Sequence, residues 1–213
     1  MMWNDHVGFH FCESRLSSSG SIHEPINAFS SLIFIGYAMY ILYSHKQHNH
    51  HTIFCCSLLT ICGIGSFLFH MHLCELFRLM DEGPMILLSC YSAYFFSSSI
   101  LGNTSCRCFF WMLYAVILLA CNPFIEPNIF RTLFGIPLAY SIYTLLHVYT
   151  IFYEEIHAIV LSSVIALLFW IIDMHFCNPI TKLFLLHTWW HVCIGYTAFK
   201  LIQVARIISL SIV

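Results

Sequence analysis

The chain has 213 residues, of which 60% are hydrophobic and only 8% are charged. Soluble domains carry about 25% charged residues, so this composition excludes a water-soluble globular protein. The net charge is −2, and the eight Lys and Arg residues form no basic patch, which excludes nucleic acid as a partner. The composition therefore predicts an all-α membrane protein in which the whole chain is one integral unit.

Apolar runs long enough to cross a bilayer recur along the chain. A spanning helix needs about 20 apolar residues, and seven runs approach that length with short polar connections between them. We therefore expect a multi-pass, seven-transmembrane-helix bundle, with residues 1–26 as an N-terminal tail and residues 27–213 as the transmembrane domain. Lys and Arg divide evenly between the two sides, so charge sets no orientation. The expected spans are 27–44, 52–72, 82–102, 107–124, 129–151, 157–176 and 185–208.

Polar residues mark one end of this bundle. The second span ends near His70, the third begins near Asp81, and the seventh begins near His187 and His191. Because consecutive spans alternate in direction, these ends lie on one face of the membrane, which is also the face of the tail. Ionisable residues within a membrane are costly and are functional by default. We therefore expect a functional site at this depth.

The spacing of these residues is typical of a metal site. Residues four apart lie on the same helix face, so His187 and His191 can hold one ion, and Ser66 and His70 share this spacing on the second span. Three neutral imidazoles with an open fourth position indicate a catalytic rather than a structural zinc site. A carboxylate at Asp81 would accept the proton of an attacking water.

Other histidines and cysteines fit this site less well. A histidine near the end of a span is most often an interfacial hydrogen-bonding residue, which is our interpretation of His72, His147 and His175. Most cysteines fall within apolar runs and are interpreted as small buried hydrophobes. Cys193 points to a different helix face from the histidine pair, whereas Cys74 stays open as an alternative ligand.

Four motifs in order along the chain carry a resemblance to a known family. They are Gly63-x-Gly-Ser-x-x-Phe-His70, Asp81-Glu-Gly-Pro-Met85, Trp170-Ile-Ile-Asp-x-x-Phe-Cys177 and His187-x-x-Trp-His191. Across nearly the whole chain, the sequence resembles the alkaline ceramidases, seven-span zinc amidases related to the adiponectin and progestin receptor group. The resemblance implies hydrolysis of the amide bond of ceramide, or of a related sphingolipid, to a sphingoid base and a fatty acid.

The resemblance also assigns roles to residues. It implies His70, His187 and His191 as Zn²⁺ ligands, Asp81 as the residue that orients and deprotonates the water, and Ser66 as a donor to the developing oxyanion. It implies a ceramide-type substrate that arrives laterally among membrane lipids, with no obligate protein partner evident. An endomembrane location, in the endoplasmic reticulum or Golgi, would place the N-terminus and the site in the lumen.

A calcium site before the first span is a further implication of the resemblance. Glu13, Glu24 and Asn27 keep positions of that site, but Arg15 stands where the family has an asparagine ligand. Calcium takes about six to eight oxygen ligands, so we expect weakened or absent Ca²⁺ binding. We also expect the guanidinium of Arg15 to replace the ion by pairing with Glu13 or Glu24.

The resembling enzymes have a disulfide between the tail and the end of the sixth span. In this chain the resemblance implies a bond between Cys12 and Cys177, provided that their face is lumenal or extracellular. Residues 1–26 would then pack over the site.

Three alternative functions stay open at this point. A receptor-like protein of the same superfamily would keep the metal site and act by binding and signalling. Another lipid hydrolase would cleave an ester or a phosphoinositol-linked lipid, because three histidines and an aspartate do not distinguish an amide from an ester. A purely structural membrane protein would use its histidines for hydrogen bonds between helices.

Overall fold

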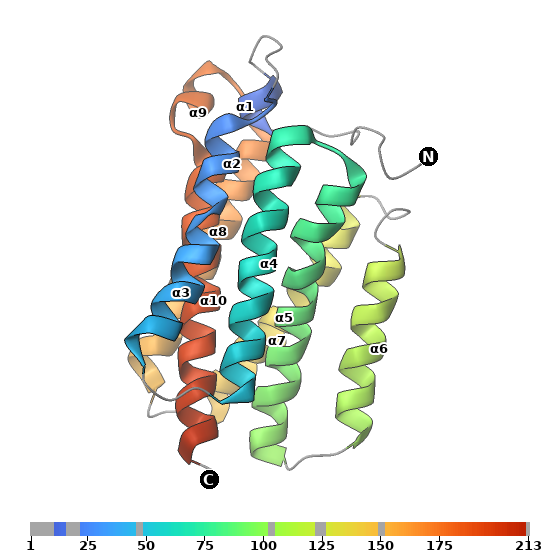
Figure 1. Cartoon of the computed structure of the whole chain (residues 1–213), viewed down its shortest axis with the longest axis vertical. Helices are drawn as coiled ribbons and strands as arrows, with labels where there is room; N and C mark the ends of the chain where they lie inside the picture. Colours follow the sequence, from blue (N-terminus) through green and yellow to red (C-terminus); the bar gives the residue numbers. More distant parts are fainter. Residues whose placement is uncertain are drawn as a thin grey trace.

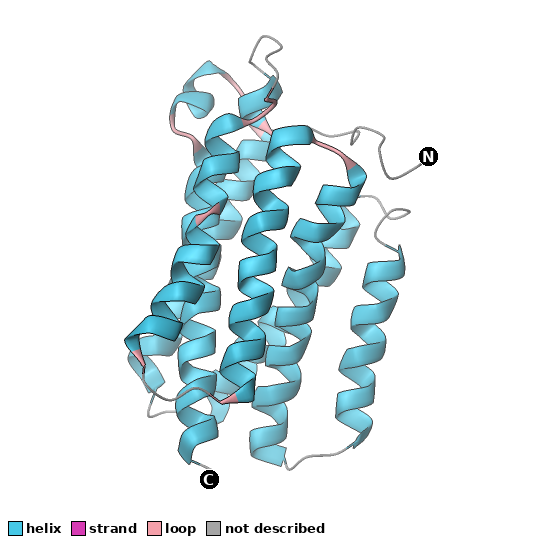
Figure 2. Cartoon of the chain, in the orientation of Figure 1, coloured by secondary structure: helices cyan, strands magenta, loops and turns pink. Residues whose placement is uncertain are grey.

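The computed structural model describes residues 11–15, 22–45, 49–101, 105–121, 127–148 and 152–211, and this part of the chain is helical without strands (Figures 1 and 2). Long helices run side by side along one axis, and the short helices α1 and α9 lie together at one end (Figure 1). The helices are α1 (Cys12–Arg15), α2 (Pro25–Ser31), α3 (Ile33–Ser44), α4 (His50–His72), α5 (Glu75–Leu101), α6 (Ser105–Cys121), α7 (Pro127–Val148), α8 (Tyr153–His175), α9 (Pro179–Leu183) and α10 (Leu186–Ser211).

Several of these helices have the dimensions of membrane spans. Four helical stretches are long and apolar enough to cross a membrane, and the apolar α6 is shorter. They are Pro25–Ser44, His50–His72, Tyr153–His175 and Leu186–Leu210. Large apolar side chains are also exposed on the outward surfaces of the bundle, such as Phe109 and Val116 on α6 and Leu161 on α8. A water-soluble protein rarely exposes so much apolar surface, so these features indicate a membrane protein.

Two expected spans differ in detail from the helices. The first expected span, 27–44, is divided by a turn at Leu32 into α2 and α3. The third begins seven residues earlier than the expected 82, because α5 starts at Glu75. Asp81 therefore lies within α5 instead of preceding it. The first two turns of α5 contain several charged residues, and for this reason the sequence indicated a polar connection here.

Apolar side chains from helices that are distant in sequence pack together in the interior of the bundle. The helices α3, α4, α5 and α10 share one buried cluster that includes Phe34, Leu59 and Ile202. A second cluster, with Phe96 and Ile159, joins α5, α7, α8 and α10. The helices that carry the polar motifs thus belong to the most firmly packed part of the bundle.

A glycine and a proline bring α4 and α5 into close contact. Pro84 lies inside α5 and has no N–H, so the carbonyl of Met80 lacks its usual helical donor. A Cβ atom at Gly65 of α4 would lie 2.7 Å from the backbone N of Asp81 and closer still to the carbonyl of Met80. The two backbones can therefore meet here only because residue 65 has no side chain. This contact fixes Asp81 against α4.

A backbone hydrogen bond and a buried leucine fix the turn between α4 and α5. Leu73 ends α4 in the left-handed region, with φ of 48°, and its N–H donates to the carbonyl of Phe69 at 2.6 Å. This conformation is unfavourable for leucine. The side chain of Leu73 is fully buried in a cluster with Phe11, Phe69 and Met174, which offsets that cost. The N-terminal segment is thereby packed against the turn.

Candidate metal centre

Three histidines converge inside the bundle near the end that carries α1 and α9. His70 comes from the last turn of α4, and His187 and His191 come from the first turns of α10. One ligand atom from each ring lies within 4.8 Å of the others, and the side chains are only 0–2% exposed. Among the described residues, this is the one group of histidines, cysteines and carboxylates with such an arrangement.

Hydrogen bonds fix the ring nitrogens of two of these histidines. Nδ1 of His70 donates to Oε2 of Glu24 at 2.6 Å, because a carboxylate can only accept. Nδ1 of His191 lies 2.7 Å from the hydroxyl of Ser30, whose single proton goes to the carbonyl of Asn27 at 2.9 Å. Nδ1 of His191 is therefore a donor as well. Both rings consequently present the lone pair of Nε2, which is the tautomer that a metal ligand requires.

The ring nitrogens that these hydrogen bonds do not use are suited to bind a transition metal ion. Nε2 of His191 is buried and has no hydrogen-bond partner among the described residues. Burying such a nitrogen without a partner is unfavourable, and a bound cation would satisfy it. Three neutral imidazoles are a donor set suited to zinc. The thiols of Cys74 and Cys193 are free and lie outside the group.

Polar groups from α4 and α5 lie beside the histidines. Asp81 is 7% exposed, and its Oδ1 accepts a hydrogen bond from the thiol of Cys62 at 3.8 Å. Ser66 is fully buried one turn before His70. Its hydroxyl lies near the carboxylate of Asp81 but makes no hydrogen bond of ordinary geometry within the described part of the chain. A carboxylate and an unused hydroxyl are thus available next to the imidazoles.

An apolar cavity opens onto this group. It has a volume of about 600 Å³ and lies between α5, α7, α8 and α10. His187 and Asp81 line it together with aromatic and aliphatic side chains such as Phe134, Trp170 and Trp190. Cavities of roughly 300–1,000 Å³ with a few convergent polar groups are typical of sites for small molecules. This one is suited to an apolar ligand whose reactive group lies at the histidines.

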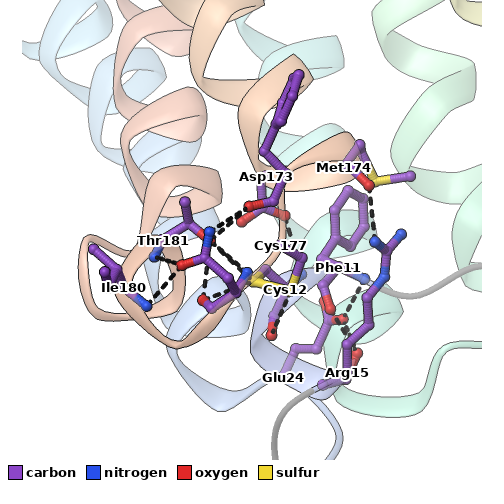
Figure 3. The surroundings of a disulfide bond; sticks show 12 residues. Phe11, Cys12, Arg15, Glu24, Asp173, Met174, Cys177, Ile180 and Thr181 are labelled. Carbon is purple, nitrogen blue, oxygen red and sulfur yellow. Dashed lines mark hydrogen bonds between the residues drawn. A yellow bond between two sulfur atoms is a disulfide. The ribbon is translucent and has the colours of Figure 1, made fainter.

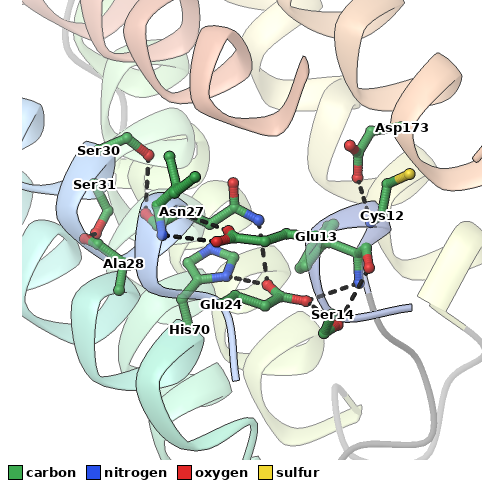
Figure 4. A network of polar contacts seen from close by, with 12 residues as sticks. Cys12, Glu13, Ser14, Glu24, Asn27, Ala28, Ser30, Ser31, His70 and Asp173 are labelled. Atoms are coloured by element: carbon green, nitrogen blue, oxygen red, sulfur yellow. Dashed lines mark hydrogen bonds and ion pairs between the residues drawn. The ribbon is translucent and has the colours of Figure 1, made fainter. Parts of the chain in front are cut away.

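The three residues expected at a degraded calcium site lie close together (Figure 4). The oxygens of Glu13 accept from the backbone N–H groups of Ile26 and Asn27 at 2.8 and 2.9 Å, so this carboxylate caps the start of α2. Glu24 accepts from the amide of Asn27 at 3.3 Å in addition to its bond with His70. Burial alone would raise the pKa of Glu24, but the hydrogen bonds that its carboxylate accepts lower it below its ordinary value. Burial raises the pKa of Glu13.

Our expectation for Arg15 is wrong. Nη1 of Arg15 donates to the backbone carbonyl of Met174 at 2.8 Å, and the ion pairs found among the described residues do not include this arginine. Oε1 of Glu24 accepts instead from the backbone N–H of Phe11 at 3.0 Å and from the hydroxyl of Ser14 at 2.5 Å. Neutral donors of α1 and its flank thus occupy the carboxylate, and the guanidinium binds α8.

Cys12 and Cys177 form a disulfide that attaches α1 to the segment after α8 (Figure 3). The backbone N–H of Cys12 also donates to Oδ2 of Asp173 at 3.1 Å. The adjacent ring of Phe11 lies over His187, with ring centroids 3.8 Å apart. Phe11 and α1 therefore lie against the histidine group.

The sequence analysis missed several contacts of the site. Ser30 and Cys62 were not singled out, since a serine within an apolar run and a cysteine among cysteines carry no distinctive pattern. Glu24 was singled out for calcium, but not as the partner of His70. Glu82 lines the cavity beside Asp81. Its place in the motif Asp81-Glu-Gly-Pro-Met85 was the one available signal.

Comparison with known proteins agrees with this geometry. No curated protein matches the chain. The model of the Ceramidase family, however, matches residues 7–212, which is nearly the whole chain, and this confirms the resemblance found in the sequence. A buried histidine group open to a cavity for an apolar ligand is consistent with a lipid hydrolase. The chain therefore belongs to the Ceramidase family and is a hydrolase of the kind that cleaves ceramide.

Proposed function

We propose that the chain is a zinc-dependent amidase that hydrolyses the amide bond of ceramide, or of a related sphingolipid, to a sphingoid base and a fatty acid. One observation carries this proposal: three buried imidazoles lie beside a buried carboxylate at the edge of an apolar cavity of about 600 Å³. His70, His187 and His191 would hold the metal. The family match favours this hydrolase over the receptor-like and purely structural alternatives.

The residues around the histidines suit the steps of amide hydrolysis. Zinc, when bound, would polarise the amide carbonyl and lower the pKa of water. Asp81 would accept a proton from the attacking water and deliver it to the leaving amine. Ser66, whose hydroxyl is not engaged in an ordinary hydrogen bond, would donate to the carbonyl oxygen as its negative charge grows. Glu24 and Ser30 would keep two imidazoles in the binding tautomer.

The same proposal includes a seven-span topology with the site on the lumenal side. Besides the four apolar stretches, α5, α6 and α7 run alongside them in the bundle (Figure 1). The disulfide of Cys12 supports a lumenal position, since disulfides persist in oxidising compartments such as the endoplasmic reticulum or Golgi lumen. Protease digestion of sealed microsomes should then spare an N-terminal epitope and remove a C-terminal one. The opposite pattern would place the site in the cytosol.

We also propose that calcium binds weakly or not at all. The oxygens of Glu13 and Glu24 already accept hydrogen bonds from the protein, and the side chain of Arg15 has no oxygen with which to bind the ion. Micromolar calcium should therefore change neither the melting temperature nor the activity. A rise in either on calcium addition would show that the cluster still binds the ion.

Metal analysis combined with a hydrolysis assay tests the central proposal. The purified protein should contain about one zinc per chain and release sphingoid base from ceramide, and a chelator should abolish this activity. His187→Ala should remove both the zinc and the activity. His147→Ala is the matched control, since His147 is exposed and its Nδ1 bonds to the carbonyl of Tyr143 in its own helix. Hydrolysis that persists in zinc-free protein would overturn the proposal.

A panel of lipids separates the amidase from the other lipid hydrolases. An ester analogue with the same chains as the ceramide tests whether the amide is required. Release of fatty acid from the ester alone would show that the protein is an esterase and not an amidase.

A further inference from the structure

The cavity beside the histidine group has its two carboxylates on one wall. Most of its lining is aromatic or aliphatic, and its carboxylates among the described residues are Asp81 and Glu82. Both belong to α5, so the acidic groups mark one side of an otherwise apolar space. Asp81 has a role in the proposed reaction, whereas Glu82 has none.

The carboxylate of Glu82 is held in place by an arginine that has a closer partner. Nη1 of Arg78 lies 3.5 Å from Oε2 of Glu82, whereas Nε and Nη2 of Arg78 donate to Glu75 at 2.9 and 2.6 Å. The guanidinium is buried, and Glu75 and Glu82 are 24% and 16% exposed. Glu75 does not line the cavity, but Glu82 does. The two glutamates thus share one cation, and only one of them faces the ligand space.

We propose that Glu82 determines specificity by accepting hydrogen bonds from the hydroxyl groups of the sphingoid base. The inference rests on the proposed ceramide substrate. In ceramide, hydroxyl groups on carbons 1 and 3 flank the carbon that bears the amide nitrogen, so they stay close to the bond being cleaved. With Asp81 acting at that bond, the next residue of α5 presents a carboxylate to these donors. A carboxylate only accepts hydrogen bonds, and bonds to an ionised acceptor are the stronger kind.

This contact would select sphingolipids among N-acyl amines. An amide without the hydroxyls would fill the same cavity but would form no hydrogen bond to the carboxylate of Glu82. Sites built to bond a substrate hydroxyl discriminate strongly against analogues that lack it, by factors far larger than an added methylene produces. The apolar chains would then add affinity, and the hydroxyl contact would add selectivity.

The test compares ceramide with the same lipid lacking the hydroxyl at carbon 1 or at carbon 3. The unmodified protein should prefer ceramide over at least one of these analogues by about 30-fold or more in kcat/KM. Glu82→Ala should lower kcat/KM for ceramide by about the same factor and change it less than about threefold for that analogue, so that the preference collapses. An equal loss for ceramide and both analogues would overturn the proposal. Glu82→Leu, which is of similar size and has no hydrogen-bond acceptor, gives the same comparison if the alanine variant folds poorly.

Two further measurements separate specificity from structure and from catalysis. Glu75→Ala removes the other partner of Arg78, which lies outside the cavity, and it should leave the preference unchanged. If this variant abolishes the preference as well, the ion-pair cluster and not the carboxylate of Glu82 is responsible. Equilibrium binding of the same lipids gives the preference without turnover. Protein that binds ceramide selectively through Glu82 but hydrolyses no lipid would disprove the proposed function and retain this inference.

Discussion

The middle of the bundle and the candidate metal centre differ in how many of their polar groups are satisfied. In the middle, several hydroxyl groups bond to the carbonyl one turn earlier in their own helix, as Ser92 does to Leu88 at 2.8 Å and Ser141 to Pro137 at 2.8 Å, although Ser162 and Thr197 also pair across helices at 2.7 Å. At the metal centre, the partners are far apart in sequence. His70 bonds to a residue 46 positions away and His191 to one 161 positions away.

The same contrast occurs within α4 alone. Ser57 and Thr60 each donate to the carbonyl four residues earlier, at 2.9 Å. Ser66 is buried more deeply than either and makes no such bond. A hydroxyl that satisfies itself locally needs no ligand, whereas a buried hydroxyl that does not is available to one. The absence of a local bond is thus what makes Ser66 a candidate for a chemical role.

Among the variants that test this contrast, the largest loss of activity is expected at Ser66. Ser66→Ala removes the proposed oxyanion donor and should lower kcat by about 10²–10³-fold, since that is the usual effect of losing one such donor. Zinc content and melting temperature should change little, because no ordinary hydrogen bond is lost. Steady-state kinetics beside metal analysis measure both quantities.

Ser57→Ala is the matched control on the same helix. Its hydroxyl bonds only to Ile53, so the change should leave kcat intact. Equal activity of the two variants would show that local hydrogen bonding does not distinguish functional from structural serines here.

The second effect concerns the close contact that brings Asp81 to α4. Gly65→Ala places a methyl group against the backbone of α5 and forces the helices apart. The expected loss is about 10²-fold in activity, as displacements of about 1 Å at a catalytic group produce, and overpacking should cost about 1–3 kcal/mol of stability. Gly36→Ala on α3, where nothing lies within 4 Å of the added atom, is the control. A Gly65→Ala variant as active as Gly36→Ala would contradict the role of this contact.

Sequence patterns predicted best what depends on short separations in the chain. Apolar runs located the helices, and the spacing of His187 and His191 placed both on one face of α10. The partner of Arg15 could not be predicted in the same way, because the carbonyl of Met174 is 159 positions away in the chain and a backbone acceptor carries no signal in the sequence. Which acceptor it meets depends on how α1 is fixed by the bond from Cys12 to Cys177.

The break at Leu32 was hidden for a related reason. The apolar run continues through it without glycine or proline, so no local signal marks the end of α2. The break nevertheless matters for the site, since α2 carries the carbonyl of Asn27 and the hydroxyl of Ser30 that fix Nδ1 of His191. Such details are decided by tertiary contacts and not by local propensity.

The smallest effect is expected at Glu24, which would act on a bound metal through His70. Glu24→Gln keeps the shape of the side chain but replaces a charged acceptor by a neutral amide. The imidazole then becomes a weaker and less well oriented ligand, and zinc affinity should fall by about 10–100-fold. Competition with a chromogenic chelator measures this affinity directly. At saturating zinc, most of the activity should return, because no group of the reaction itself is lost.

Glu24 has a second role that must be separated from its bond to His70. Glu24 accepts from Phe11, Ser14 and Asn27 in addition to His70, so its replacement also loosens the N-terminal segment. If Glu24 served only to attach that segment, the variant would lose thermal stability while its zinc affinity stayed unchanged. Glu154→Gln, in the exposed first turn of α8, shows the effect of removing a carboxylate with no such contacts. A fall in zinc affinity for Glu24→Gln alone would therefore assign to this long-range bond a part in metal binding.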